Sequence, residues 1–494
     1  MKMVSKYVRE QKRYTKNDLR EIFELSEDSV ERFIRNLKSY GVLKSVKNTE
    51  KQREMSELMD DDIEVTDGSE DSGTCLYVFT YVGVITCGSR IIKVYPKYLL
   101  SKYDDNQLLD RMRQIVRVLE RYSHSEEQII NIYNGDGENK SFNLLAVMLY
   151  LMRDYFEYGI YTNSEDIIEI NGEGEILWEK TIDESFALIS ENRPYYMELY
   201  TRKTVDDDMD YFKRLHEYII TDCSRQLRNA ELSELFGLEI AEISDEAIDD
   251  FGDKEYILDR IYKELNIQYN TRKQILLKTI YTYISQDKKL LDEDSGFSMF
   301  GTTAYHAVWE KMCSEIFDNK LHKTLKQLNL MHKIDTPYED YLCDGLLIEV
   351  IKKPIWERKQ EGISLSAQET LIPDLISFYE EGKEKQFIIF DAKYYNIKIE
   401  KNILTGNPGV GDVTKQYLYH LAYKKFIETF NFTSVKNCFL MPTEKDHIVS
   451  YGVAKMQILE DLGLENIQIR LLPGDVVAEL YLSNQKMNIK QLGL

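Results

Sequence analysis

Hydrophobic residues in the last part of the chain, residues 291–494, cluster in short runs separated by polar turns. Runs of this length predict buried strands, since a strand buried on both faces need not alternate apolar and polar residues. Two stretches near 304–319 and 413–430 instead repeat their apolar residues with helical spacing. The mixture predicts an α/β domain over 291–494. The expected strands lie at 344–351, 374–381, 386–395, 437–442 and 467–472.

The pattern at the start of the chain is different, and residues 1–48 predict three short helices. Thr15 and Asp18 have the spacing of a helix capping box. Gly41 stands where a helix C-cap glycine belongs. The helix before Gly41 has one apolar face, whose residues recur at i, i+3, i+4 and i+7: Val30, Phe33, Ile34 and Leu37.

Two helices joined by a turn and followed by a β-like segment are the layout of a winged helix-turn-helix. The second helix of such a unit would lie in a DNA major groove. Winged helices also dock on proteins, so a small protein-interaction domain is the alternative. The residues expected to contact DNA are on the exposed face of this helix: Arg32, Arg35, Asn36 and Lys38.

We assign residues 1–100 to this winged-helix-like domain, with an acidic, aperiodic insertion at 49–74. The segment 75–100 is rich in Tyr, Val and Ile, reads as two or three strands, and would complete the sheet of the wing. Lys93 and Lys97 in this segment, and Lys102 just after it, are expected to be solvated.

Residues 101–290 form a mainly helical middle domain in this reading. The stretch 141–161 is apolar nearly all round, which is typical of a helix buried on several sides. Residues 172–182 contain two glycines followed by a strand-like run. No catalytic spacing occurs here, so we interpret the middle domain as scaffold or partner-binding surface. The predicted fold class is therefore multidomain α+β, ending in an α/β domain.

Composition restricts the function further. The formal net charge of −22 and the pI of about 5.0 disfavour wholesale coating of nucleic acid, because an acidic protein repels phosphate. The six cysteines are far apart and include no CxxC pair, so neither a zinc module nor a disulfide framework is expected. The N-terminus lacks the apolar core of a signal peptide, and the longest apolar run, 144–152, is too short to span a bilayer. These features predict a cytoplasmic protein with no membrane partner.

Candidate chemistry lies in the last domain. Asp374 begins one expected strand and Asp391 ends the next, so an antiparallel hairpin would bring the two carboxylates together. Because side chains alternate along a strand, Asp391 and Lys393 would point the same way. Adjacent buried carboxylates favour a cation between them. Mg²⁺ or Mn²⁺ held by Asp374, Asp391 and the Ala392 carbonyl would suit phosphodiester hydrolysis, with Lys393 beside the metal-bound water.

The string Pro-Asp, sixteen residues, Asp-Ala-Lys resembles the signature of the PD-(D/E)XK nucleases. Families of this fold often have a glutamate on the helix before the hairpin, where this chain has Glu310, and a glutamine on the helix after it, where this chain has Gln416. The resemblance implies a restriction-endonuclease-like domain with both in the catalytic site. Lys415 and Tyr419 would then reach the backbone phosphates of DNA.

Most of residues 75–450 resembles the LlaJI-type restriction endonucleases, which are similar to the McrC nuclease subunit. "VYPKY" at 94–98 and "LWEKTI" at 177–182 contribute to this resemblance. It implies a bacterial restriction system in which a DNA endonuclease subunit cuts double-stranded DNA with an AAA+ NTPase partner of McrB type, with or without a DNA methyltransferase. The chain has no G-x-x-x-x-G-K-[ST] sequence, so it is not that motor itself. The alternatives are an inert DNA-binding or assembly protein and a nuclease that acts on RNA.

Overall fold

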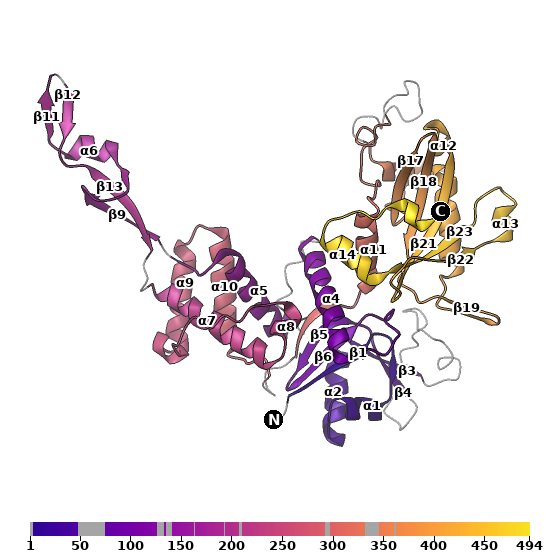
Figure 1. Cartoon of the computed structure of the whole chain (residues 1–494), viewed down its shortest axis with the longest axis horizontal. Helices are drawn as coiled ribbons and strands as arrows, with labels where there is room; N and C mark the ends of the chain where they lie inside the picture. Colours follow the sequence, from indigo (N-terminus) through magenta and orange to yellow (C-terminus); the bar gives the residue numbers. More distant parts are fainter. Residues whose placement is uncertain are drawn as a thin grey trace. The chain divides into compact units, whose positions relative to one another are not determined.

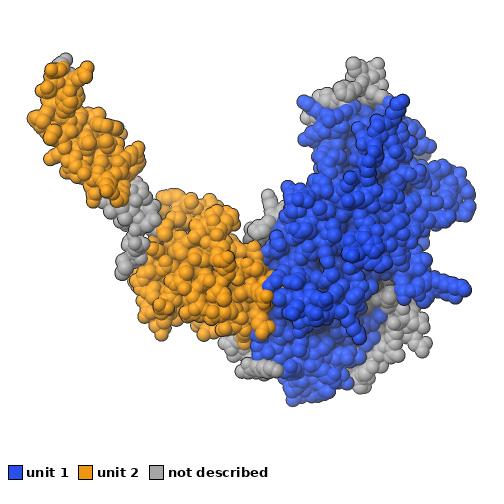
Figure 2. Space-filling view, in the orientation of Figure 1, with its two compact units in different colours: residues 1–129, 299–494 blue, residues 130–298 orange. Residues whose placement is uncertain are grey.

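The computed structural model describes residues 3–47, 75–125, 133–134, 141–162, 164–191, 193–206, 210–291, 297–330, 345–359 and 362–494. The chain divides into two compact units, which Figure 2 colours separately. Unit 1 combines residues 1–129 with residues 299–494, and unit 2 is residues 130–298. The expectation of a multidomain chain with helices and mixed sheets is confirmed. Unit 1 thus includes residues of both the N-terminal and the C-terminal parts of the chain, and the domain bounds expected from the sequence stay predictions.

Within residues 3–47, the described part of the region 1–48 where the sequence suggested three helices, the structure has two. Residues 4–9 form strand β1, which pairs in parallel with β6, a partner more than eighty residues away in sequence. The capping box of Thr15 and Asp18 is confirmed at the start of α1. The predicted apolar face of α2 is buried. The elements are β1 (Val4–Arg9), β2 (Arg13–Tyr14), α1 (Lys16–Ile22), α2 (Glu27–Ser39), β3 (Leu43–Lys47), β4 (Cys75–Phe79), β5 (Val82–Cys87) and β6 (Arg90–Tyr95).

These strands form two small sheets. One has the order β2-β4-β3, so β4 completes the sheet of β3 across the acidic insertion, as the sequence predicted. The other has the order β1-β6-β5-β14, where β14 is Phe297–Thr302. Helix α4 (Asp105–Ser125) also belongs to unit 1 and packs on α14 (Gly474–Leu482).

The C-terminal part of unit 1 is built on a five-stranded sheet in the order β17-β18-β21-β23-β22 (Figure 1). Strands β17 and β18 form an antiparallel hairpin, and β18, β21 and β23 run parallel. Phe387 and Ile389 of β18 pack in the cluster that includes helix α12, while Phe390 stacks on Phe317 beyond α11. The two helices therefore cover opposite faces of the hairpin. The elements are α11 (Tyr305–Ile316), β17 (Leu375–Glu381), β18 (Glu384–Ala392), α12 (Val410–Thr429), β21 (Ser434–Thr443), β22 (Val449–Ala454) and β23 (Ile467–Pro473).

The strand expected at 344–351 is wrong, because residues 347–350 form a short 3-10 helix, η3 (Leu347–Val350). Only Leu347 of that helix is buried, so its apolar run does not need a place in the sheet. The sequence also missed β22, an edge strand whose residues are at most partly buried. The remaining elements of this part are β15 (Ile355–Arg358), β16 (Ile363–Ser366), β19 (Lys398–Glu400), β20 (Ile403–Thr405), α13 (Gln457–Glu460) and η4 (Ile489–Leu492).

Unit 2 contains a helical core and a strand-rich segment. The predicted all-round burial of 141–161 is confirmed for α5, of which nine residues are buried. The strand-like run expected within 172–182 is mostly wrong, because β10 covers only Glu175–Ile176 and α6 begins at Trp178. The helices of the core are α5 (Leu144–Tyr158), α7 (Tyr211–Asn229), α8 (Ser233–Phe236), η1 (Ile248–Phe251), α9 (Lys254–Ile267) and α10 (Thr271–Gln286), preceded by the hairpin β7 (Tyr133–Asn134) and β8 (Ser141–Phe142).

The strand-rich segment, residues 164–206, is called the β9–β13 segment below (Figure 1). It contains a sheet in the order β10-β13-β9 and the hairpin β11–β12. Its elements are β9 (Ser164–Ile170), β10 (Glu175–Ile176), α6 (Trp178–Glu184), β11 (Ala187–Ser190), β12 (Arg193–Tyr196) and β13 (Tyr200–Asp206). Within the described parts of the whole chain, no helix combines the length and hydropathy that a membrane crossing requires.

Candidate active site

The β17–β18 hairpin brings the two predicted aspartates together. Leu375 pairs with Phe390, so Asp374 and Asp391 occupy neighbouring positions where the hairpin ends. The Asp374 Oδ2 atom accepts a hydrogen bond of 2.9 Å from the Ala392 N–H. Asp391 is only 4% exposed. The polar turn around Gly382, whose φ is +62°, sets this register because it lets β18 return directly beside β17.

Burial dominates the electrostatics of Asp391. Desolvation raises the pKa of Asp391 to about 9, and the hydrogen bond and negative charge of Asp374 add to the shift. Lys393 acts in the opposite direction but does not cancel the effect. The pair therefore holds a proton at neutral pH unless a further cation compensates the second carboxylate.

Lys393 lies between two carboxylates. Its Nζ atom is 3.2 Å from Asp391 Oδ1 and 3.0 Å from Asp412 Oδ1. Burial alone opposes the charged form of this lysine, but the charges of Asp391 and Asp412 outweigh it, and its pKa is raised. Lys393 is thus cationic at neutral pH, with its ammonium fixed from two sides. The backbone N–H of Lys393 donates to the Leu440 carbonyl (2.9 Å), which anchors the backbone to β21.

Asp412 is a residue whose part in this arrangement the sequence reading missed. The sequence suggested Asp412 as the N-cap of a helix, but the N-cap of α12 is Gly409. Asp412 lies three residues further on, and its Oδ2 accepts from the Gly409 N–H (3.2 Å). The same carboxylate also holds Lys393 through its other oxygen. Helix α12 therefore fixes the lysine of the hairpin as well as covering it.

Glu310 lies on α11. Desolvation raises the pKa of Glu310 to about 7; the charge of Asp374 raises it further, and Lys393 lowers it. The neighbouring Trp309 is fully buried and donates through Nε1 to the Leu440 carbonyl (3.1 Å), the same oxygen that accepts from Lys393 N–H. Helix α11 is thus tied to the strand that supports Lys393.

Gln416 lies on α12 and is fully buried. Its Nε2 donates to the Ile389 carbonyl (2.9 Å), two residues before Asp391, and among the described residues its Oε1 has no partner. The structure therefore gathers Asp374, Asp391, Lys393, Glu310 and Gln416 around the end of one hairpin. Their catalytic roles stay predictions.

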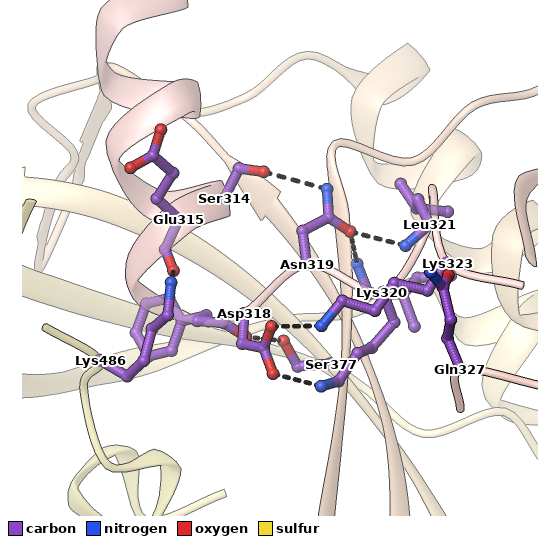
Figure 3. A network of polar contacts seen from close by, with 12 residues as sticks. Ser314, Glu315, Asp318, Asn319, Lys320, Leu321, Lys323, Gln327, Ser377 and Lys486 are labelled. Atoms are coloured by element: carbon purple, nitrogen blue, oxygen red, sulfur yellow. Dashed lines mark hydrogen bonds and ion pairs between the residues drawn. The ribbon is translucent and has the colours of Figure 1, made fainter. Parts of the chain in front are cut away.

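The backbone at Asp374 is held by Asn319, a residue that was not singled out from the sequence. Figure 3 shows its side chain between Ser314 and Leu321. The Asn319 Nδ2 donates to the Asp374 carbonyl (3.2 Å), and its Oδ1 accepts from the Ile376 N–H (3.1 Å) and the Leu321 N–H (3.1 Å). Ser314 of α11 accepts a second hydrogen bond from Nδ2 (3.0 Å). One amide side chain thus joins the end of α11 to the first residues of β17.

The predicted DNA contacts are spread over two elements. Lys415 is exposed on α12, and the four residues predicted on α2 (Arg32, Arg35, Asn36 and Lys38) are exposed. Tyr419 is instead buried, and its hydroxyl donates to the Ile372 carbonyl (2.8 Å), which gives it a structural partner. DNA contact by the exposed residues stays a prediction.

The donors at the hairpin suit a hard divalent cation in kind. Asp374 and Asp391 present carboxylate oxygens, which Mg²⁺ and Mn²⁺ prefer, and Asp391 lacks full compensation of its charge. Over the described ranges, no three His, Cys, Asp or Glu side chains converge as a ready-made metal cluster. A cation here would therefore be bound by two carboxylates, with backbone, water or substrate oxygens completing its coordination.

A comparison with known protein families identifies the family to which the chain belongs. The sequence model of a family of restriction endonucleases matches residues 81–337 and 346–477, which is most of the chain. This match shows that the chain belongs to the LlaJI restriction endonuclease family.

A relative from Bacillus subtilis (strain 168), described as type II restriction enzyme BsuMI component YdjA, is 28% identical over 429 residues. The alignment covers 86% of this chain and 84% of that protein.

Two solved structures are also similar. One is a half-complex of Thermococcus gammatolerans McrB AAA+ hexamers with bound McrC, with 11% identity, a TM-score of 0.34 and coverage of 97% of this chain and 99% of that chain. The other, the McrBC complex of the same organism, has 12% identity, a TM-score of 0.24 and coverage of 62% and 85%. Similarity at this level does not establish a shared fold.

Proposed function

We propose that this chain is the DNA endonuclease subunit of a bacterial restriction system and that it hydrolyses phosphodiester bonds of double-stranded DNA with Mg²⁺ or Mn²⁺. The observation that supports this most is the Asp374–Asp391 pair, in which Asp391 is buried, with Lys393 fixed beside it. Together with the order of α11, hairpin and α12, it supports the PD-(D/E)XK arrangement that the sequence resemblance implies. Membership of a restriction endonuclease family agrees with this activity.

Each residue of the hairpin has a distinct role in the proposal. Asp374 and Asp391 would hold the cation, which supplies an activated water and offsets negative charge on the phosphate. Lys393 stays cationic because Asp391 and Asp412 stabilise its ammonium. Its positive charge would stabilise the excess negative charge that the phosphate develops during hydrolysis.

The helices complete the proposed site. Glu310, with a pKa raised to about 7 by burial and Asp374, can take up or release a proton near neutral pH. Gln416 has its donor fixed on the Ile389 carbonyl and an unsatisfied oxygen, so it would accept a hydrogen bond from water or substrate.

A partner is part of the proposal. The Bacillus subtilis relative is described as a component of a restriction enzyme, and this chain has no nucleotide-binding P-loop sequence. We expect an AAA+ NTPase of McrB type, with or without a DNA methyltransferase in the same system. The β9–β13 segment is a candidate docking surface, because large apolar side chains are solvent-exposed on it: Trp178, Ile182, Phe186, Leu188, Ile189, Tyr195 and Met197.

The winged-helix-like arrangement of α1, α2 and the β2-β4-β3 sheet supports a second role in DNA readout. Its exposed cationic helix face also fits the competing hypothesis, an inert DNA-binding or assembly protein. The two hypotheses differ in whether the chain cleaves DNA and binds a divalent cation, so one experiment separates them.

The test combines cleavage with metal binding. The purified chain, alone and with its NTPase partner and NTP, is incubated with double-stranded DNA and Mg²⁺. We expect cleavage by the wild type and none by Asp391→Ala or Lys393→Ala. Binding of Mn²⁺, measured by calorimetry, is expected for the wild type and not for Asp374→Ala. Cleavage by both hairpin variants at the wild-type rate would disprove the site, and no cleavage by any form would favour the inert protein.

A further inference from the structure

A polar cavity adjoins the hairpin and extends to the N-terminal part of unit 1. It has a volume of about 250 Å³, and its lining includes Glu310, Ala392 and Lys393 together with Lys97. Lys97 follows β6, and the sequence analysis expected it to be solvated. In the structure Lys97 is only 6% exposed, as is the adjacent Glu10. Lys97 and Lys393, the proposed catalytic lysine, therefore both line this cavity.

The position of Lys97 is fixed by the chain that leaves the catalytic strand. Its N–H donates to Tyr394 Oη (3.2 Å) and to Glu10 Oε2 (3.1 Å), and its carbonyl accepts from Asn396 Nδ2 (3.0 Å). Tyr394 follows Lys393 directly, and its hydroxyl donates to the same Glu10 oxygen (2.6 Å). Movement of Lys97 relative to Lys393 would break several of these bonds at once.

The ammonium of Lys97 has unused capacity for an anion. Its Nζ atom donates to Gln11 Oε1 (3.2 Å) and lies 4.8 Å from the ring centroid of Tyr394 and 5.7 Å from that of Tyr395. Throughout the described residues, no carboxylate pairs with it within 4.0 Å. An ammonium has three donors, and aromatic faces offset only part of the cost of burying its charge. At least one donor is therefore left for an oxygen ligand in the cavity.

We propose that Lys97 binds the phosphodiester adjacent to the scissile one on the same DNA strand. This proposal rests on the proposed endonuclease function. The cavity would receive this phosphate while the scissile one lies at Asp391 and Lys393. Glu10 does not oppose this binding directly, because its carboxylate is engaged by the Tyr394 hydroxyl and the Lys97 N–H. Lys97 would thus set the register of the strand relative to the hairpin.

The test pairs a side-chain change with a change in the substrate. Once the cut position is mapped from the product ends, duplexes are made with one uncharged methylphosphonate at either phosphate flanking the cut. We expect wild-type cleavage to fall about 10- to 100-fold for one of the two duplexes, as for the loss of a charge-assisted hydrogen bond. Lys97→Met should lose a similar factor on unmodified DNA and be insensitive to the methylphosphonate. Lys97→Arg should retain the wild-type pattern.

Lys102→Met is the matched control, since Lys102 is an exposed lysine five residues away, and it should cut like the wild type. Equal sensitivity of wild type and Lys97→Met to the methylphosphonate would overturn the proposal. If Lys97→Met does not fold, an undiminished wild-type rate on both modified duplexes overturns it equally well. A wild type that does not cut unmodified DNA even with its NTPase partner and NTP refutes the endonuclease function itself, which separates the two failures.

Discussion

The β17–β18 hairpin and the β9–β13 segment use hydrophobic strand residues in opposite ways. In β18, the run from Phe387 to Ala392 is buried between two helices. In the β9–β13 segment, Phe186 is 82% exposed and Ile189 is 77% exposed, although both are in or next to a strand. Burial on both faces makes the hairpin a rigid support for charged groups at its end. Exposure of large apolar side chains instead suits a surface that a partner covers.

The two regions should therefore respond differently to mutation. A change at the end of the hairpin should abolish chemistry with little loss of fold, because the charges there are costly to bury. A change on the β9–β13 segment should alter neither fold nor chemistry, and should affect only processes that need a partner.

The largest effect is expected for Asp391→Asn. Cleavage should fall by about 10³-fold or more, since one of two proposed metal ligands is lost. Stability should rise, because the pKa of Asp391 is raised to about 9, so the folded protein binds its proton more strongly than the unfolded chain does. This group therefore destabilises the wild type increasingly as pH rises from about 4 to about 9. Urea unfolding at pH 5 and pH 9 should show a larger gain for the variant at pH 9.

A double substitution on the other region, Phe186→Ser with Ile189→Ser, is expected to weaken partner binding by about 100-fold, the scale of lost interface hot spots. Thermal unfolding should be unchanged because both side chains are already exposed. Pull-down and calorimetry with the NTPase measure the effect, and Glu198→Ser on the same segment is the control. Full binding by the double variant would remove the β9–β13 segment as the docking surface.

Much of the hairpin could be predicted from the sequence because its geometry depends on residues that are close together in the chain. Alternation along β18 and the residue after it places Asp391 and Lys393 on one side, and a short polar turn fixes the register of Asp374. Both are properties of a few consecutive residues. The same applies to the capping box at Thr15 and to the apolar face of α2.

The features that sequence reasoning missed depend on distant contacts. Strand β1 was not predicted, because its pairing partner, β6, lies far along the chain. The ion pair of Asp412 with Lys393 exists only after α12 packs on the hairpin, so no local pattern points to it. Asn319 and Lys97 had no local signal, since their partners come from β17 and from the segment after Lys393. An apolar run in the sequence does not show whether its residues are buried, so the exposure of Phe186 could not be predicted either.

A smaller effect is expected at Asn319, whose amide holds the backbone at Asp374. Asn319→Ala should lower cleavage about tenfold by misplacing one carboxylate, and should raise the Mg²⁺ concentration needed for half-maximal rate. Ser314→Ala is the matched control, because it removes a partner of the same amide without freeing the Asp374 carbonyl. An unchanged Mg²⁺ requirement in Asn319→Ala would show that the amide only stabilises the fold.

The smallest effect concerns Glu310, and it is visible chiefly as a change with pH. Burial and Asp374 raise its pKa to about 7, so it is mostly protonated at pH 6 and mostly ionised at pH 8. If the carboxylate is the working form, the wild-type rate should rise with pH and level off above about 7. Glu310→Gln cannot ionise, so it should lose about fivefold at pH 8, less at pH 6, and show no inflection.

The pH dependence of the unfolding free energy of Glu310→Gln tests whether burial raises the pKa of Glu310. A carboxyl whose folded pKa exceeds its unfolded value of 4.5 costs stability increasingly as pH rises from about 4.5 to about 7. Glu310→Gln removes this cost, so its unfolding free energy should fall less than that of the wild type between pH 5 and pH 8. Glu315→Gln on the same helix, where the carboxylate pairs with Arg121 (2.9 Å), should leave the pH–rate profile unchanged. If Glu310→Gln retains the inflection near pH 7, the titrating group is another residue, and Glu310 supports α11 without taking part in the reaction.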